Sequence, residues 1–346
     1  MTDDLHTLLI GREAMACRFE VAFNAGEVAD ATALACRALD LVDDIEARIS
    51  VYRESSELAR VNALAAVDWV DVSPDLFRLL NRARELTELT AGGFDIAAGT
   101  LVRAWGFLHR AGRTPPEDAV AAALAASGTR WLELDSDRGR VRFSKPGVEL
   151  NPGAIGKGWA LDRALEMLVD AGVRSVLLHG GQSSVTARGI QGPTQPGRRG
   201  WKVGLRHPLR TGRRLATITL VDRALGTSGS GTQFFVDRGR RLGHILDPRT
   251  GRPAEGVISA TAIAASAADA DALATALYVL GPGGLPRIAP AGGDVAAILV
   301  MPGPAPGTIS VELANVAPDV VTIEHEPGIT VAWRETTAAP AARAHP

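Results

Sequence analysis

The chain has 346 residues, of which 46% are hydrophobic and 22% charged, and its formal net charge is −2. This length suits one large domain or two ordinary ones, with enough apolar residues for a substantial core. The near-neutral charge argues against a nucleic-acid-binding surface, which would show an excess of basic residues. It still permits a phosphate ligand, because one anion site needs only a few local cations and backbone N–H groups.

In chain order, the first half of the sequence alternates between strand and helix patterns. Residues 12–23 are predicted to form a strand, and apolar residues at three- and four-residue steps predict an amphipathic helix over 30–50. Ser73 is expected to be the N-cap of the next helix, with Pro74 in its first turn and a diglycine at 92–93 as its stop. A helix near 116–127 and strands at 130–135 and 140–144 complete this half.

The second half begins with a glycine-rich loop and has more strand patterns than helices. Helices are predicted over 160–171 and 268–280, and the strands alternate in the way typical of antiparallel sheets. The strand candidates are 175–178, 201–206, 215–220, 233–236, 258–265, 295–300 and 320–323. No internal repeat and no clean linker divides the chain, so the pattern predicts a mixed α+β fold.

The loop NPGAIGKG, residues 151–158, has the composition of a phosphate-binding loop. Its glycines allow close backbone approach, and Lys157 supplies positive charge. It is not a P-loop, because its glycine spacing is two residues short and Gly158 stands where the magnesium-binding hydroxyl should be. The residues alone leave open whether the loop holds a phosphate.

Asp271 and Thr275 lie four residues apart and therefore share one face of the helix predicted over 268–280. A carboxylate and a hydroxyl in this arrangement can both direct oxygens at a hard cation such as Mg²⁺. The alternative is an aspartate in the first helical turn, favoured by the helix dipole, beside an ordinary threonine.

Two other segments carry candidate ligand contacts. His244 is expected at a strand end just before a turn that starts at Asp247, a position suited to a catalytic imidazole and equally to a structural one. Phe94 and Asp95 directly follow the diglycine. This pair fits stacking on a ring and acceptance of its N–H groups, or a core phenylalanine followed by a helix N-cap.

The ends of the chain and its cysteines carry further expectations. The N-terminus lacks the positive region and long apolar core of a signal peptide, and no later run reaches transmembrane length, so a cytoplasmic location is expected. Cys17 and Cys36 have no metal-binding spacing and are expected to be buried thiols. Residues 336–346 are rich in alanine and proline and are expected to form a disordered tail.

Taken together, the motifs resemble those of the FAD:protein FMN transferase family, the ApbE-type flavin transferases. They are EAMAC with Met15, ISVYRESSELARVN with Tyr52, GGFD…LVRAWGF, NPGAIGKGWALDRAL, LLHGGQSSVTARG, TSGSGTQFF, GHILDPRTGRP and ADALATALYVLG. The resemblance covers about residues 12–281. It implies an ApbE-like α+β fold, with one domain over 1–335 and a ligand cleft between two interleaved subdomains.

The resemblance also implies an activity, namely magnesium-dependent transfer of the FMN half of FAD to a Ser or Thr hydroxyl of a carrier protein, with release of AMP. FAD is then a substrate and Mg²⁺ the cofactor. His244 is the implied base beside the acceptor hydroxyl, and Lys157 binds near the pyrophosphate. The implied FAD contacts are Met15, Tyr52, Gly93, Phe94, Asp95, Asn151, Lys157 and Ile245, and the implied metal ligands are Asp271, Thr275 and the carbonyl of Ala154.

Two positions depart from the family pattern. Asn151 stands where the family loop usually begins with aspartate, and Gln182 replaces an acid after the second diglycine. Both changes remove negative charge near the implied pyrophosphate site. Two alternatives therefore stay open, an FAD pyrophosphatase in which water replaces the acceptor hydroxyl, and an FAD-binding protein without turnover. Many members of the family are exported lipoproteins, whereas this sequence shows no lipobox.

Overall fold

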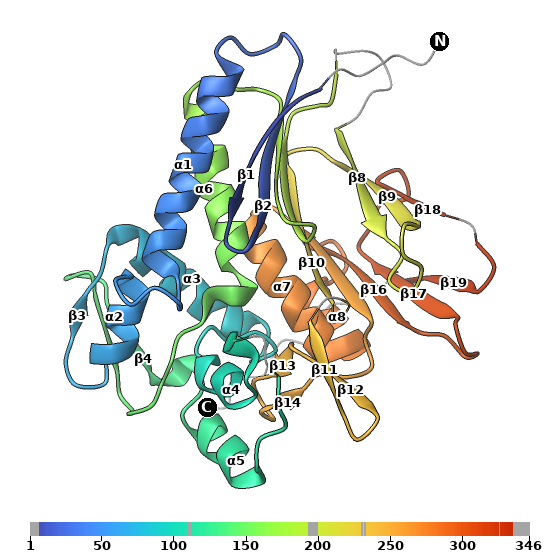
Figure 1. Ribbon diagram of the computed structural model, residues 1–346. Helices are drawn as coiled ribbons and strands as arrows, with labels where there is room; N and C mark the ends of the chain where they lie inside the picture. Colours follow the sequence, from blue (N-terminus) through green and yellow to red (C-terminus); the bar gives the residue numbers. More distant parts are fainter. Residues whose placement is uncertain are drawn as a thin grey trace, which may run out of the picture.

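The computed structural model describes residues 7–109, 112–192, 200–229, 231, 233–324 and 326–334. It shows a large sheet with helices packed on one face and a small sheet on the other (Figure 1). The predicted α+β class is confirmed. The tail at 336–346 lies outside the described residues, so its disorder stays a prediction.

Within the described residues, the large sheet has nine strands, and all neighbours are antiparallel except the last two. Their order is β1 (Thr7–Ala14), β2 (Cys17–Asn24), β6 (Val176–Gly180), β7 (Ser184–Arg188), β10 (Arg223–Gly229), β15 (Ser259–Ala264), β16 (Ala296–Pro302), β17 (Ile309–Ala314) and β19 (Ile329–Arg334). This order places β10 at the centre of the sheet, next to β7. Strand β7 begins within the motif LLHGGQSSVTARG, just after its two glycines.

Helices cover one face of the large sheet. They are α1 (Ala31–Ile49), α6 (Gly156–Asp170) and α7 (Ala267–Leu280), with α3 (Pro74–Leu89) packed on α7 (Figure 1). Because α7 contacts both β10 and β15, it lies over the middle of the sheet. The apolar faces of these helices and of strands such as β2 and β6 form the main core.

The opposite face of the large sheet packs on a three-stranded sheet of β18 (Val321–Ile323), β9 (Arg214–Leu220) and β8 (Trp201–Arg206). Side chains such as Ile218 and Ile298 form a second core between the two sheets. Both faces of the large sheet are therefore buried in its middle, whereas the edge strands β1 and β19 are largely exposed.

Smaller elements surround these layers. The α-helices among them are α2 (Glu57–Leu64), α4 (Gly99–Ala104), α5 (Glu117–Ala125) and α8 (Leu285–Ile288), and the 3-10 turns are Phe107–His109, Thr129–Trp131, Pro152–Ala154 and Gly281–Gly284. The strands are β3 (Val70–Asp71), β4 (Leu132–Asp135) and β5 (Arg140–Phe143) in one sheet, β11 (Phe234–Asp237) with β12 (Arg240–Gly243), and β13 (Leu246–Asp247) with β14 (Arg252–Pro253).

The strand predicted over 12–23 is wrong, because these residues form the hairpin β1–β2. Ala14 pairs with Cys17, and the two residues between them turn with positive φ angles of 49° and 57°. Glycine and asparagine usually fill such turns, whereas this one is Met15–Ala16, so the sequence carries no turn signal. The backbone N–H of Met15 donates to Glu46 Oε2 of α1 at 2.8 Å, which holds the turn against the helix.

The helix predicted after the glycine loop begins at Gly156, earlier than expected from the apolar pattern. Lys157 and Gly158 therefore belong to the first turn of α6. The predicted cap of α3 is confirmed, since Ser73 Oγ accepts the N–H of Leu76 at 3.3 Å and Pro74 is the first helical residue.

Candidate active site

Asp271 is buried where α7 meets α6 and β7, with 7% of the residue exposed. Its Oδ2 accepts the backbone N–H of Gly158 at 2.9 Å, and Ser184 Oγ lies 2.8 Å from each of its carboxylate oxygens. Gly158 is the third residue of α6, where an N–H has no acceptor within the helix. The Asp271 carboxylate supplies that acceptor from a different helix.

Two glycines allow α7 to come this close. A Cβ at Gly158 would lie 2.1 Å from the carbonyl oxygen of Ala267, and a Cβ at Gly226 of β10 would lie 2.4 Å from the carbonyl of Ala270. In both cases the obstacle is backbone, which cannot move aside as a flexible side chain can. The position of Asp271 therefore depends on these two glycines.

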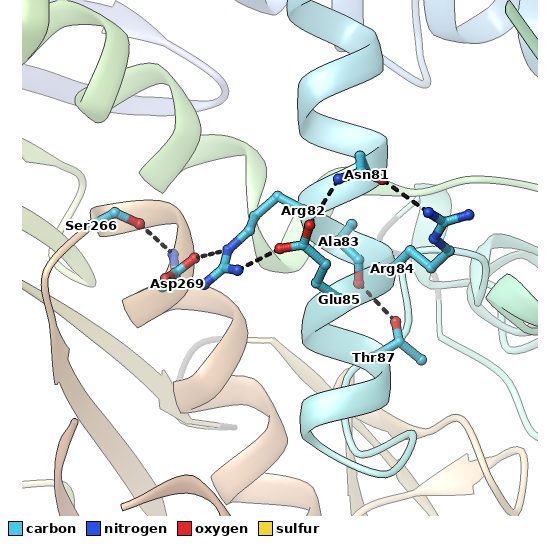
Figure 2. A network of polar contacts seen from close by, with 8 residues as sticks. All are labelled: Asn81, Arg82, Ala83, Arg84, Glu85, Thr87, Ser266 and Asp269. Carbon is cyan, nitrogen blue, oxygen red and sulfur yellow. Dashed lines mark hydrogen bonds and ion pairs between the residues drawn. The ribbon is translucent and has the colours of Figure 1, made fainter. Parts of the chain in front are cut away.

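The start of α7 is fixed by polar contacts with α3, which Figure 2 shows, and by contacts with α6. Ser266 is the N-cap and accepts the N–H of Asp269, whose carboxylate in turn binds Arg82 of α3 at 2.9 and 2.7 Å. Asp162 of α6 accepts the first two amides of α7. Burial raises the pKa of Asp162 to about 6, although these two amides oppose that shift.

Burial also raises the pKa of Asp271 to about 6, because the charged carboxylate has lost its water. Lys157, in the first turn of α6, opposes this shift most strongly among its neighbours, followed by Ser184 and the Gly158 amide. The charge of Lys157 also acts on Cys17 and His244. Lys157 is thus the electrostatic link between α7, the β1–β2 hairpin and the segment that follows β12.

Thr275 follows Asp271 by one helical turn, as predicted. Its Oγ1 donates to the backbone carbonyl of Asp271 at 3.2 Å and lies 2.9 Å from Ser228 Oγ of β10. Asp271 is not in the first turn of α7, where Asp269 stands instead. The interpretation of Asp271 as a first-turn residue favoured by the helix dipole is therefore wrong.

The predicted metal ligands have oxygen donors of the kind that Mg²⁺ prefers, a carboxylate, a hydroxyl and a carbonyl. The helical hydrogen bonds of α6 begin with the carbonyl of Ile155, which accepts the N–H of Trp159. The carbonyl of Ala154 therefore lies before the helix. Across the described ranges, no group of three or more His, Cys, Asp and Glu side chains has a metal-binding arrangement. The buried Asp271 carboxylate fits a hard cation, because a cation would offset the loss of hydration that raises its pKa, and its role as a ligand stays a prediction.

His244 directly follows β12, at the strand end that the sequence predicted. Its Nδ1 lies 3.1 Å from the backbone carbonyl of Gln233, which can only accept, so Nδ1 carries the proton and Nε2 is left with a free lone pair. Burial lowers the pKa of His244, and Lys157 lowers it further, while the Gln233 carbonyl opposes the shift. The imidazole is therefore neutral at pH 7 and able to accept a proton.

Met15 and Tyr52 lie around the end of α1. Met15 is tied to Glu46 in the last turns of that helix, and the N–H of Tyr52 donates to Ser50 Oγ just after it. The first turn of α6 meets the same helix end, because a Cβ at Gly156 would lie 3.1 Å from Ile49 Cδ1. Tyr52 is 67% exposed, so its ring is free to contact a ligand.

The GGFD segment joins the glycine loop through the backbone, where the N–H of Asn151 donates to the carbonyl of Ile96 at 2.7 Å. Gly93 is packed against Leu280 of α7. Phe94 is 2% exposed and belongs to the main core, which confirms the alternative in which it is a core phenylalanine. The contact of its ring with a ligand stays a prediction.

Asp95 is not the N-cap of α4, which has Ala98 at that position and no side-chain cap. Its carboxylate instead accepts the backbone N–H groups of Ala97 and Thr129 at 2.8 to 3.1 Å. Burial is the main cause of a raised pKa at Asp95. Asn151 Oδ1 accepts the N–H of Gly153 at 2.9 Å and so shapes the turn before α6.

Ile245 is 8% exposed and follows His244 into the turn GHILDPRTGRP. Its carbonyl accepts the N–H of Ala254 at 2.9 Å, and the carbonyl of Asp247 accepts from Thr250 and Gly251. Gly251 has a φ of 73°, which confirms the predicted turn. His244 and Ile245 are therefore presented by a closed, hydrogen-bonded loop.

The sequence did not identify Ser184, Ser228 or Gln233 as parts of the site. Each lies in a motif quoted above, HGGQSSV or TSGSGTQFF, but nothing in those motifs shows that one serine would meet Asp271 and another Thr275. Ser230 and Thr232 of the second motif lie outside the described residues.

Comparison with known proteins places the chain in a family. The model of the ApbE family matches residues 15–299. The chain therefore belongs to the ApbE family, and the expected family and fold are confirmed. The crystal structure of an ApbE protein from Thermotoga maritima has a TM-score of 0.77 and 28% identity, and covers 86% of this chain and 94% of that one. A flavinyl transferase ApbE from Pseudomonas stutzeri has a TM-score of 0.75 and 26% identity, covering 86% and 92%.

Similar curated proteins are named FAD:protein FMN transferase. The one from Rhodobacter capsulatus is 41% identical over 238 residues, which are 67% of this chain but only 44% of that protein. The one from Treponema pallidum is 34% identical over 252 residues, 70% of this chain and 69% of its own length. The chain thus spans less than half of the Rhodobacter relative. None of the helices in the described part of the chain is long and apolar enough to cross a membrane.

Proposed function

We propose that this protein is a transferase that moves the FMN half of FAD onto a Ser or Thr hydroxyl of a carrier protein and releases AMP. The observation that carries the proposal is the set of charges around Lys157, whose ammonium acts on both the buried Asp271 and the neutral His244. Membership of the ApbE family and the names of the similar proteins support the same conclusion.

In the proposed reaction, the acceptor oxygen forms a bond to the phosphorus of the FMN half, and the P–O bond to AMP breaks. His244 Nε2 takes the hydroxyl proton, because its Nδ1–H is held by the carbonyl of Gln233. Lys157 stabilises the negative charge that gathers on the phosphate oxygens. AMP leaves with the electrons of the broken bond, so atoms and charge balance.

Asp271, Thr275 and the carbonyl of Ala154 are the proposed ligands of Mg²⁺. When bound, the dication neutralises charge on the pyrophosphate oxygens. Ser184 and the Gly158 amide hold the Asp271 carboxylate in one orientation, which prepares it as a ligand. A cation at this position also offsets the burial of the carboxylate, which otherwise raises its pKa.

The flavin nucleotide is proposed to lie between the end of α1 and the GGFD segment. Met15, Tyr52, Gly93, Phe94 and Asp95 are its proposed contacts at the adenine and ribose end, and Asn151 and Ile245 complete the site. Tyr52 is the residue among them with the most exposed ring, which suits it to stacking.

The decisive experiment separates transfer from hydrolysis and from simple binding. The protein is incubated with FAD, with or without Mg²⁺ and with or without a carrier that has a Ser/Thr acceptor, and AMP, free FMN and carrier-bound flavin are quantified. AMP matched by carrier-bound flavin supports the transferase. AMP matched by free FMN identifies a pyrophosphatase, and intact bound FAD under all conditions identifies a binding protein.

A further inference from the structure

The hairpin β11–β12 forms a two-stranded sheet of its own and extends away from the body of the molecule (Figure 1). Its tip is the two-residue turn Arg238–Gly239, with φ angles of 48° and 77°. None of the roles proposed above for FAD or Mg²⁺ uses this hairpin, although it starts and ends beside His244.

The two faces of the hairpin differ. On the inner face, the Phe235 ring lies 5.7 Å from that of Phe107 and 6.4 Å from that of Trp105, which anchors the hairpin in a small aromatic core. On the outer face, Phe234 is 44% exposed and Val236 is 63% exposed. These two side chains give the outer face an apolar contact area that a partner can bury.

The hairpin is joined to His244 at both ends. Gln233 directly precedes β11 and its carbonyl accepts from both the backbone N–H and Nδ1 of His244, which itself directly follows β12. The His244 ring also packs on the Phe107 ring in a T-shaped arrangement, with 6.4 Å between the ring centroids, and Phe107 in turn packs on Phe235. A molecule bound on the outer face is therefore held at a fixed distance from the imidazole.

The hairpin is basic in a chain that is weakly acidic. Its ten residues include three arginines and one aspartate, whereas the whole chain has a net charge of −2. Arg238, Arg240 and Arg241 are all exposed, but Arg240 forms an ion pair with Glu255 at 2.7 Å, so the contacts with acidic side chains are assigned to Arg238 and Arg241. The guanidinium of Arg241 lies 3.7 Å above the Phe234 ring, so positive charge and exposed apolar surface occur on the same face.

We propose that the outer face of the β11–β12 hairpin is the docking surface for the carrier protein, and that it selects a segment with acidic and apolar side chains next to the acceptor hydroxyl. This inference rests on the proposed transfer to a protein. The arginines attract and orient the acidic side chains, Phe234 and Val236 bury the apolar ones, and the connection to His244 brings the hydroxyl to its base.

The test uses the full chain with FAD and three fluorescein-labelled peptides of equal length, each with a central threonine. One has flanking Asp and Leu, the second has Asn in place of Asp, and the third has Lys. Fluorescence anisotropy is expected to give about tenfold tighter binding for the acidic peptide than for the Asn peptide, and a loss of that difference at high salt. Equal binding of the acidic and Asn peptides overturns the proposal.

Three variants locate the site. Arg238→Glu and Arg241→Glu are expected to weaken binding of the acidic peptide by about tenfold each, and Phe234→Ser by a similar factor. The matched control is Arg138→Glu, because Arg138 also precedes a glycine in an exposed hairpin turn, that of β4–β5, which is distant in the sequence. If the control loses as much binding as Arg238→Glu, the hairpin is not the site. A single-stranded oligonucleotide that binds as tightly as the acidic peptide shows a general polyanion surface and also overturns the proposal.

FAD binding and AMP release without a carrier are measured on the same variants and are expected to remain unchanged. These measurements distinguish a failure of the docking proposal from a failure of the proposed function. Selective binding of the acidic peptide that depends on the hairpin supports docking even if no flavin is transferred, and transfer that is insensitive to all three variants supports the function while overturning the docking surface.

Discussion

The backbone N–H of Gly158, in the first turn of α6, donates to the carboxylate of Asp271 on α7 across 2.9 Å. The contact satisfies an amide that has no acceptor in its own helix, and it fixes the proposed metal ligand relative to Lys157. The same carboxylate has its pKa raised to about 6 by burial. Stability and the proposed metal binding are thus linked at one side chain.

The first prediction concerns Asp271→Asn in protein freed of metal by a chelator. The raised pKa means that the folded state holds this proton more tightly than the unfolded state does. The contribution of Asp271 to stability is therefore full below its unfolded pKa and is lost as the pH rises through about 6. At about pH 7.5 the variant is expected to be more stable than the wild type, by at most about 3 kcal/mol.

Urea unfolding at about pH 7.5 and about pH 4.5 tests this, because the difference should fall to about a third at the lower pH. Added Mg²⁺ should stabilise the wild type and leave the variant unchanged. A difference of the same size at both pH values would contradict the assignment of the shift to Asp271.

The second prediction is that Gly158→Ala destabilises the protein by about 2–4 kcal/mol. The new Cβ would meet the backbone carbonyl of Ala267, so α7 must move away from α6. The control is Gly283→Ala, where a Cβ meets nothing within 4 Å. Thermal unfolding of both variants checks this, and a Gly158→Ala protein as stable as its control would show that the helices are not in the described contact.

The third prediction is that Ser184→Ala raises the pKa of Asp271 further, because the charged carboxylate loses a hydrogen-bond donor. Since Mg²⁺ binds the deprotonated form, the pH at which half of the protein binds the metal should rise by about one unit. Isothermal titration calorimetry with Mg²⁺ across pH measures this midpoint. Ser183→Ala is the control, and an unchanged midpoint in Ser184→Ala would remove the serine from the site.

The fourth prediction is that His244→Ala lowers flavin transfer by about 10²- to 10⁴-fold while FAD affinity changes little. Because burial lowers the pKa of His244, the wild-type rate should rise with pH, with a midpoint below the ordinary histidine value of about 6.5, and then level off. Deprotonation of Asp271, whose pKa is about 6, contributes to the same increase of the rate with pH. Transfer rates and FAD binding are measured over a pH series, and a loss confined to FAD binding would mean that the histidine is structural.

The elements that the sequence predicted well are those set by local patterns. Apolar periodicity predicted α1, α3 and α7, and the one predicted serine N-cap, Ser73, marked the start of α3, because helix periodicity and capping act within a few residues. The shared face of Asp271 and Thr275 follows from the same periodicity. For the same reason the strand-end position of His244 was predicted from the turn that follows it.

The features that were not predicted depend on residues far apart in the chain. β10 was missed because its sequence RALGTSG is poor in β-branched residues, and Gly226 is needed there only because α7 packs on it. Ser184 meets Asp271 across 87 residues, which no local pattern can indicate. The turn at Met15–Ala16 is held by Glu46 of α1 rather than by its own residue types.

The acceptor that fixes the His244 tautomer is a backbone carbonyl, that of Gln233, and not a carboxylate or an amide side chain. Every amino acid has this group, so no substitution at position 233 can delete it without moving the chain. The orientation of the imidazole is therefore protected against point mutation, while the side chain at 233 and the outer face of the adjoining hairpin are free to diverge. A protein built in this way can change the surface proposed for its partner over evolutionary time and keep the orientation of the proposed base.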